Sequence, residues 1–189
     1  MTYLEVLTDI CSRVADPDLD TYKERAKDHF LRAITMLINE GKYTEYDIAG
    51  FVKTKATMKF TAGSEDINTL KVFKILDFYM PPGTDADVII TFQETPLLNK
   101  ISALETLQPS MYDLFIYQEG NILKAYTGAT PVFILGTTNC TMKYIQDIDD
   151  SAWIDTTDLQ AAANFQLTYT FTRTCIDIAS KTLLDEVNL

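Results

Sequence analysis

The chain has 189 residues, and its 27 acidic against 16 basic side chains leave a formal net charge of −11. A hydrophobic share of 47% with 23% charged residues is typical of a folded globular protein. This charge excludes general binding to nucleic-acid phosphates, because that affinity comes from lysine and arginine. The acidity has two interpretations. One is a charge for solubility, its commoner meaning, and the other is the wall of a channel past which DNA slides.

The cysteine content and the first residues bear on the cellular compartment. Cys11, Cys140 and Cys175 are odd in number and far apart, so the sequence predicts no disulfide framework and a reducing compartment. Glu5 and Asp9 stand where a secretory signal would have a basic start and an apolar run. No stretch approaches the roughly 18 uninterrupted apolar residues of a membrane helix. We therefore expect a soluble, intracellular protein.

Helical periodicity dominates the first fifty residues. Apolar spacing predicts a first helix over residues 4–14. A second is predicted over 21–41, because Thr21 and Glu24 match the capping-box pattern and a glycine ends the run. A third, short helix is predicted over 44–52. Together these segments predict an N-terminal helical hairpin followed by a short helix.

Strand patterns follow in the middle of the chain. Short runs of alternating or continuous apolar residues predict strands over 57–61, 70–78, 88–92, 114–117, 122–126, 132–135 and 141–145. A proline at 96 predicts the start of a short helix that ends near residue 107. The last four strands, with turns between them, predict an antiparallel β-meander.

A long helix is predicted over residues 156–187, with two apolar stripes that indicate packing on two sides. This order of elements predicts an α+β fold in one domain, residues 1–189. Its helical bundle comprises the N-terminal hairpin and the long C-terminal helix, residues 1–53 and 156–189. The antiparallel β-meander is expected as an insertion over 54–150.

The sequence holds little that points to catalysis. His29, the only histidine, lies in the second predicted helix. A Cys–His nucleophile pair with Cys11 or Cys140 is conceivable, but neither thiol has a glycine-rich elbow or a flanking signature. A single histidine without paired cysteines leaves no conventional zinc site. We therefore expect His29 to be a surface or interface residue.

Two acidic clusters, at 16–20 and 147–151, have the alternate spacing of a calcium loop. Neither has the glycine at the sixth position and the glutamate at the twelfth that an EF-hand needs. No Walker or Rossmann glycine pattern occurs. The sequence therefore predicts no enzyme, no metal, no cofactor and no catalytic residue. A hydrolase with paired carboxylates is a remote alternative, because such a pair meets only in the fold.

The single tryptophan, Trp153, comes just before the long C-terminal helix. The favoured interpretation is a staple that packs this helix onto the sheet. An interface anchor is the alternative, because tryptophan is also common among residues that dominate binding energy.

The element order resembles that of the head-to-tail connector proteins of tailed bacteriophages, the adaptor rings that dock beneath the portal. The phrases AKDHFLRAI at residues 26–34 and DIAGFV at 47–52 are similar to ring proteins of crAss-like phages. The resemblance covers most of the chain as an order of elements, and no invariant signature accompanies it.

The resemblance implies a structural virion protein, assembled in the host cytoplasm. It would form a homo-oligomeric, dodecameric ring between the portal and the neighbouring tail or ring proteins. The ring would continue the DNA channel, through which packaged DNA is retained and later ejected. Double-stranded DNA would pass without specific binding, and no membrane would take part. The acidic residues expected to charge the channel are Asp16, Asp18, Asp20, Asp147, Asp149 and Asp150. The residues expected at interfaces are Trp153, Leu183, Leu184, Val187 and Leu189.

A second hypothesis belongs to another class of protein. In it, the chain is a small acidic protein-binding module, regulatory or chaperone-like, that holds a partner on its Tyr- and Phe-rich sheet. The mass of the protein in solution and its presence or absence in phage particles distinguish the two hypotheses.

Overall fold

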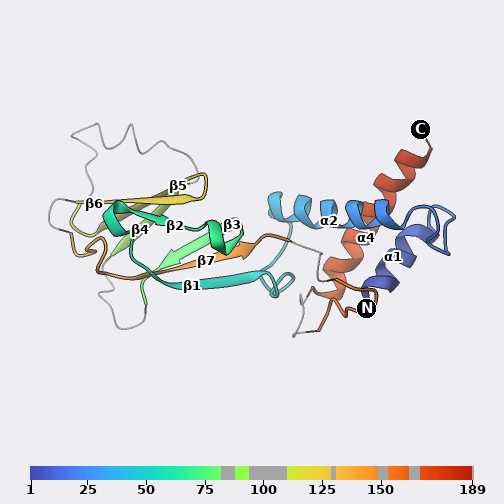
Figure 1. Cartoon of the computed structure of the whole chain (residues 1–189), viewed down its shortest axis with the longest axis horizontal. Coiled ribbons are helices and arrows are strands. Elements are labelled where there is room, and N and C mark those ends of the chain that lie inside the picture. The colour runs from blue at the N-terminus through green and yellow to red at the C-terminus, as the bar shows by residue number, and fades with distance from the viewer. Residues whose placement is uncertain (82–87, 94–109, 129–130, 149–152, 162–166, 189) are drawn as a thin grey trace. The chain divides into compact units, whose positions relative to one another are not determined.

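The computed structural model describes residues 1–81, 88–93, 110–128, 131–148, 153–161 and 167–188. The chain forms two compact units: a helical unit of residues 1–52 and 148–189, and a β unit of residues 53–147. In the described part of the chain, the helical unit contains three α-helices and the β unit contains two sheets (Figure 1).

The predicted fold class, a helical bundle with a small inserted meander, is wrong. The structure is mixed, with three helices and seven strands among the described residues, and the strands build two sheets with a core of their own. The error arises because periodicity identifies a strand but not its partner, which is chosen by packing between residues far apart in the chain.

Helix α1 (Tyr3–Ser12) begins at a capping box that the sequence analysis did not identify. The Glu5 N–H donates to the Thr2 hydroxyl at 3.3 Å, and the Thr2 N–H donates to the Glu5 carboxylate at 2.8 Å. Two backbone donors that have no partner within the helix are thereby satisfied. The helix ends two residues before the predicted end.

Helix α2 (Lys23–Asn39) forms as predicted, but with a different cap. Its N-cap residue is Tyr22, which makes no side-chain cap bond, so the predicted capping box is wrong. The carboxylate of Asp16 accepts instead from the N–H groups of Thr21 and Tyr22, at 3.1 and 2.8 Å. After the helix, Gly41 adopts a φ of +68°, a left-handed conformation that glycine adopts without steric cost.

Helix α4 (Tyr169–Val187) is shorter than the predicted helix over 156–187. The described residues before it bond to the beginning of the chain instead: the Tyr3 N–H donates to the Thr157 carbonyl at 2.9 Å, and the Leu159 N–H to the Met1 carbonyl at 3.2 Å. Their backbone groups are thus committed to a tertiary contact. Thr168 starts the helix, where its hydroxyl accepts from the Phe171 N–H.

The predicted third helix over 44–52 is also absent from these described residues. Thr44 and Asp47 form a turn in which the Asp47 carboxylate accepts from the Thr44 N–H at 2.9 Å. The same carboxylate accepts from the Thr168 hydroxyl at 2.6 Å, and Ile48 pairs with Leu167 in an isolated antiparallel bridge. Polar and backbone bonds to the start of α4 have therefore replaced helical ones.

The helices pack on one another around a common core. Helix α2 contacts α4, and α1 contacts both of them. The largest apolar side chains that α1, α2 and α4 bury in this core are Tyr3, Val6, Leu7, Ile10, Phe30, Ile34, Leu37, Ile38, Phe171, Ile176 and Leu183.

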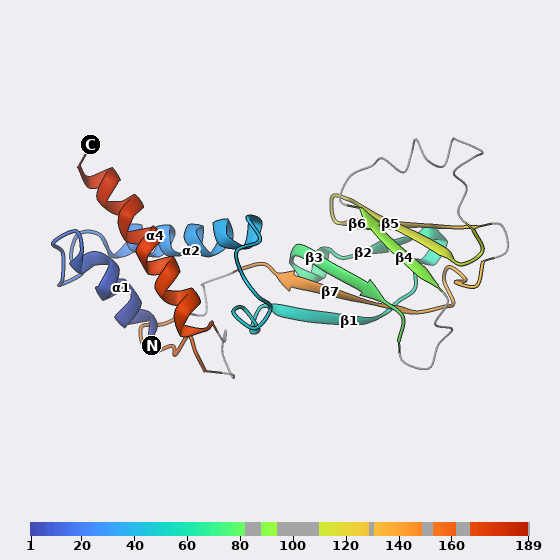
Figure 2. The ribbon, with the colours of Figure 1, turned by 180° about the vertical axis from the view of Figure 1, so that it is seen from behind.

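The first sheet has the order β1-β7-β3, so that β7 is central (Figure 2). Its strands are β1 (Val52–Met58), β7 (Cys140–Gln146) and β3 (Val72–Tyr79). Strand β3 pairs antiparallel with β7, and two register shifts interrupt the pairing. The predicted strand over 132–135 does not form, because those residues make turns that place Phe133 in the core.

The second sheet has the order β2-β6-β5-β4. Its strands are β2 (Ser64–Asp66), β6 (Ile122–Thr127), β5 (Asp113–Glu119) and β4 (Ile89–Gln93). The predicted hairpin between β5 and β6 is confirmed, with Gly120 at a φ of +60° in its turn. Strands β4 and β5 run parallel, which a meander does not allow. The predicted helix near 96–107 lies outside the described residues.

Both sheets contribute to the core of the β unit. The most buried of its side chains are Met58, Phe60, Ile67, Leu114, Ile116, Leu123, Phe133, Cys140 and Met142. The other side of β7 carries Thr141, Lys143 and Ile145, of which Thr141 and Ile145 are buried and Lys143 is half-buried.

Candidate interaction surfaces

The three cysteines are free thiols buried in the cores of the two units. Burial raises the pKa of Cys11 to about 11, with a further contribution from Asp16. Burial likewise raises the pKa values of Cys140 and Cys175, each to about 12. The thiolate is the reactive form, so these side chains are protonated and inert at neutral pH.

We expect a thiol reagent such as 5,5′-dithiobis(2-nitrobenzoate) to modify none of the three cysteines in the native protein at pH 8 within minutes. The same reagent should modify all three in denaturant, because unfolding removes the burial that protects them. Absorbance at the product wavelength measures the result. Rapid modification of one thiol in the native protein would contradict the inert state of that cysteine.

His29 pairs with a carboxylate, not with a thiol. Its Nε2 lies 2.7 Å from an oxygen of Glu186, and an Arg25 guanidinium nitrogen lies 3.2 Å from the other oxygen. The hydrogen bond from His29 lowers the pKa of the Glu186 carboxyl, opposed by desolvation and helped by the charge of Arg25. The contact ties the last turn of α4 to the first turns of α2.

A second ionic network joins α1 to α4. Asp9 pairs with Arg173 and, at 3.3 Å, with Arg13, and Arg13 also reaches Asp177 at 2.7 Å. The Arg173 guanidinium also lies 5.5 Å from the centroid of the Tyr169 ring. The side chains alternate in charge and pair with one another, so the network holds α1 and α4 together within the helical unit.

Trp153 lies in the core of the helical unit with 6% of its surface exposed. Its ring packs edge-on against Tyr3, with centroids 5.2 Å apart, and lies 6.3 Å from the rings of Phe30 and Phe51. The indole therefore packs in the core of the helical unit. Its ring partners come from α1, α2 and the segment before β1, which differs from the predicted staple between the last helix and the sheet.

The other residues expected at interfaces lie at the end of α4. Leu183 is fully buried, Leu184 is 41% exposed and Val187 is partly exposed. Leu189 lies outside the described residues. Leu184 is thus the most exposed of the described apolar side chains in this set.

The acidic residues expected to charge a channel lie in different structural environments. Asp16 caps α2, whereas Asp18 and Asp20 are exposed in the turn between α1 and α2. Asp147 is exposed just after β7, where its N–H donates to the Lys71 carbonyl at 2.6 Å. Asp149 and Asp150 lie outside the described residues.

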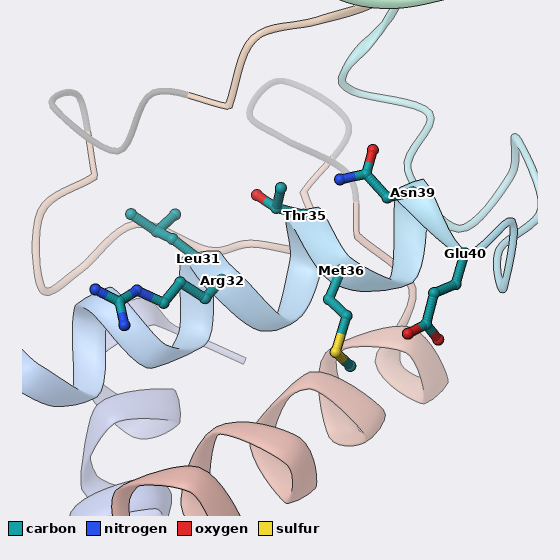
Figure 3. A pocket seen from close by; sticks show the side chains of 6 residues that line it. All are labelled: Leu31, Arg32, Thr35, Met36, Asn39 and Glu40. Carbon is teal, nitrogen blue, oxygen red and sulfur yellow. The ribbon is translucent and has the colours of Figure 1, made fainter.

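A groove on the outer face of α2 is the surface that the sequence analysis missed. Two rows of side chains with the i, i+4 spacing of a helix border it, and its volume is about 480 Å³. Figure 3 shows the lining residues Leu31, Arg32, Thr35, Met36, Asn39 and Glu40. The rows lie opposite the buried stripe of α2, and the apolar members are Leu31 and Met36. The sequence held one signal for this groove: two apolar residues that lie outside the main apolar stripe of the helix.

Charge is unequally divided between the two units. The helical unit has 8 basic and 17 acidic residues, a net charge of −9, whereas the β unit has 8 basic and 10 acidic residues, a net charge of −2. Within the β unit, six lysines lie in or directly beside the strands of the first sheet: Lys53, Lys55, Lys59, Lys71, Lys74 and Lys143. The acidic residues there are Asp77 and Asp147. This sheet is therefore locally basic in an acidic protein.

The described part of the chain shows neither a metal-binding cluster nor a helix that could span a membrane. No three His, Cys, Asp or Glu side chains gather there in a way that could hold a metal ion. None of the helices described is both long enough and apolar enough to cross a membrane.

Comparison with known proteins adds no family. No protein-family model matches the chain, and no curated protein matches it.

Proposed function

We propose that this chain is a structural subunit of a head-to-tail connector ring in a tailed bacteriophage virion. It acts by assembly and not by catalysis, as a homo-oligomer that docks on the portal and on the next tail or ring protein. The dodecameric number and the place beneath the portal are those that the resemblance in element order implies.

The observation that carries the proposal is the outward face of α2. A helix on the surface of a monomer normally has one apolar face, towards the core, and a polar face towards water. Helix α2 buries one face, and along a groove on the other Met36 is exposed and Leu31 is half-buried. A groove between two ridges of a helix suits the ridge of another helix, as in a ring wall.

The acidity of the helical unit supports the same proposal. With a net charge of −9, this unit repels phosphates, so a channel wall made from it would let a duplex slide without trapping. Asp18 and Asp20 are exposed and suited to such a wall. The same charge would disfavour close packing of copies unless other contacts compensate.

The mass of the purified protein, alone and mixed with a phage portal protein, tests the proposal. We expect closed rings by native mass spectrometry and electron microscopy, and the chain itself in purified phage particles. A stable monomer that does not bind the portal protein and is absent from phage particles would favour the small protein-binding module instead.

We expect Met36→Glu, alone or with Leu31→Glu, to weaken self-association by at least about tenfold, roughly 1.4 kcal/mol, because it places a charge in an apolar contact. Analytical ultracentrifugation measures the dissociation constant, and circular dichroism verifies the fold. Leu4→Glu on α1 is the matched control, since Leu4 and Met36 are both 37% exposed. An equal loss in both variants would show that the groove has no special part in assembly.

A further inference from the structure

The backbone at the end of β1 takes a course that its own residues disfavour. Thr57, Phe60 and Ala62 have φ values of +67°, +52° and +52°, in the left-handed region that favours glycine. A β-branched residue such as Thr57 is a genuine outlier in that region. Three such residues among six make a strained kink, which persists only because the surrounding structure holds it.

We propose that this kink, residues 57–62, is a conformational guard on the edge of the first sheet. In the described state the kink closes the end of β1 to strand pairing. When the kink is released, its residues straighten into a regular strand, and the longer edge pairs with the same edge of a second copy. The inference concerns the single chain, so it goes beyond the proposed ring and does not rest on it.

The straight state is the one that the local sequence favours. Residues 57–61 alternate as a strand does, and the structure keeps the alternation of burial that a regular strand would give. Met58 and Phe60 are fully buried. The residues beside them, Thr57, Lys59 and Thr61, are exposed. Straightening therefore removes the strain and leaves the same two side chains facing the core.

A second segment, residues 133–136, holds the kink in place and is called the latch below. The Gly136 N–H donates to the Lys59 carbonyl at 2.6 Å, and the Phe133 ring lies 6.4 Å from the Phe60 ring. Gly136 has a φ of +78°, which glycine adopts without steric cost. The hydrogen bond and the ring contact both oppose straightening, so the kink opens when the latch leaves the core.

The kink lies on an edge where strand pairing has to be controlled. Strand β1 pairs with β7 on one side, and in the described part of the chain no strand pairs with its other side (Figure 2). An open edge is a template for a strand of another chain, and bulges and lysines are common protections against that pairing. Strand β1 has both, because Lys53 and Lys55 precede the kink. Of the two protections, the kink is the one that can be released.

Glycine substitutions test the inference by locking the kink. We expect Thr57→Gly and Ala62→Gly each to slow hydrogen exchange of the backbone amides of residues 57–63 at least about threefold, because glycine tolerates the left-handed region and disfavours a regular strand. The amides of residues 136–138 should slow with them, since the kink and the latch open together. NMR spectroscopy of the full chain measures both segments.

The matched controls place the same substitutions at other backbone angles of the same strand. Thr54 and Ala56 are exposed, as Thr57 and Ala62 are, but neither has a positive φ. Thr54→Gly and Ala56→Gly should therefore speed exchange in β1, because glycine weakens a strand. If Thr57→Gly and Ala62→Gly also sped exchange, the kink would not be the native state and the inference would be overturned.

Gly136→Ala tests the release of the latch. A β-carbon at a φ of +78° is strained, so this variant should speed exchange in the latch and the kink together by at least about threefold. Sedimentation velocity should show association beyond that of the wild type, with the amides of β1 newly protected, because the straightened edge pairs with a second copy. Adding Thr57→Gly and Ala62→Gly to the same chain should reverse both effects.

Gly120→Ala is the control for this variant, because Gly120 also has a positive φ, +60°, but belongs to the turn between β5 and β6. It should speed exchange in its own hairpin and leave β1 and association unchanged. If Gly136→Ala opened the latch without the kink, the inference would be overturned. If both opened without added association, the guard on the edge would be overturned. Either result would leave the proposed ring intact, since the mass of the wild-type assembly tests that separately.

Discussion

We expect Trp153→Ala to lower the free energy of unfolding of the helical unit by about 3–5 kcal/mol, the usual cost of deleting a large buried aromatic side chain. The indole is nearly inaccessible and touches the rings of Tyr3, Phe30 and Phe51. Its removal leaves a cavity where three segments meet, and it also removes ring–ring contacts of favourable geometry. Urea denaturation followed by circular dichroism measures the loss.

The neighbouring residue supplies the control. Ile154 is 65% exposed, so Ile154→Ala should change stability by no more than about 0.5 kcal/mol. Hydrogen exchange should locate the loss caused by Trp153→Ala in α1, α2 and α4. A tryptophan variant as stable as the wild type would mean that the described packing around the indole is not the native one.

The second large effect is expected in the β unit, where Phe133→Ala should also cost about 3–5 kcal/mol. Phe133 is 1% exposed, and its ring lies 6.4 Å from that of Phe60 in an edge-on arrangement. Phe133 belongs to a segment of turns that makes no strand hydrogen bonds. Its buried side chain therefore holds that segment on the core. We expect increased exchange of the backbone amides on both sides of residue 133.

Ile134→Ala is the matched control, because Ile134 is 53% exposed beside the buried phenylalanine. It should leave stability within about 0.5 kcal/mol of the wild type. If residues 132–135 were a strand in the sheet, as their apolar run predicted, both variants would disturb it. A large effect of Phe133→Ala alone distinguishes an anchored turn from a strand.

Capping shows how local signals succeed or fail. The pattern from Thr21 to Glu24 matches a capping box, yet the backbone donors before α2 are satisfied by Asp16. The pair Thr2 and Glu5 forms the real capping box of α1. Both pairs have the required residue types at the required spacing. The competing carboxylate of Asp16 comes from five residues earlier, outside the pattern, and decides the result.

The candidate surfaces were only partly predictable. Asp18 and Asp20 are exposed in the turn between α1 and α2, as charged turn residues usually are, and their part in a channel stays a prediction. The groove on α2 was missed, since a single outlying Leu31 or Met36 means little until both are found to line the same groove. The basic sheet was missed because its lysines come from three separate stretches of a chain with a strongly acidic total.

The acidity of the chain, its helical hairpin and most of its strands were determined by the sequence alone, because composition and periodicity are properties of neighbouring residues. The tertiary structure decided the rest: which strands pair, that β4 and β5 run parallel, where α4 begins, and that the charge divides unequally between two units. Each of these depends on contacts between residues tens of positions apart. Such contacts are selected by the burial of apolar surface across the whole fold, which no local pattern records.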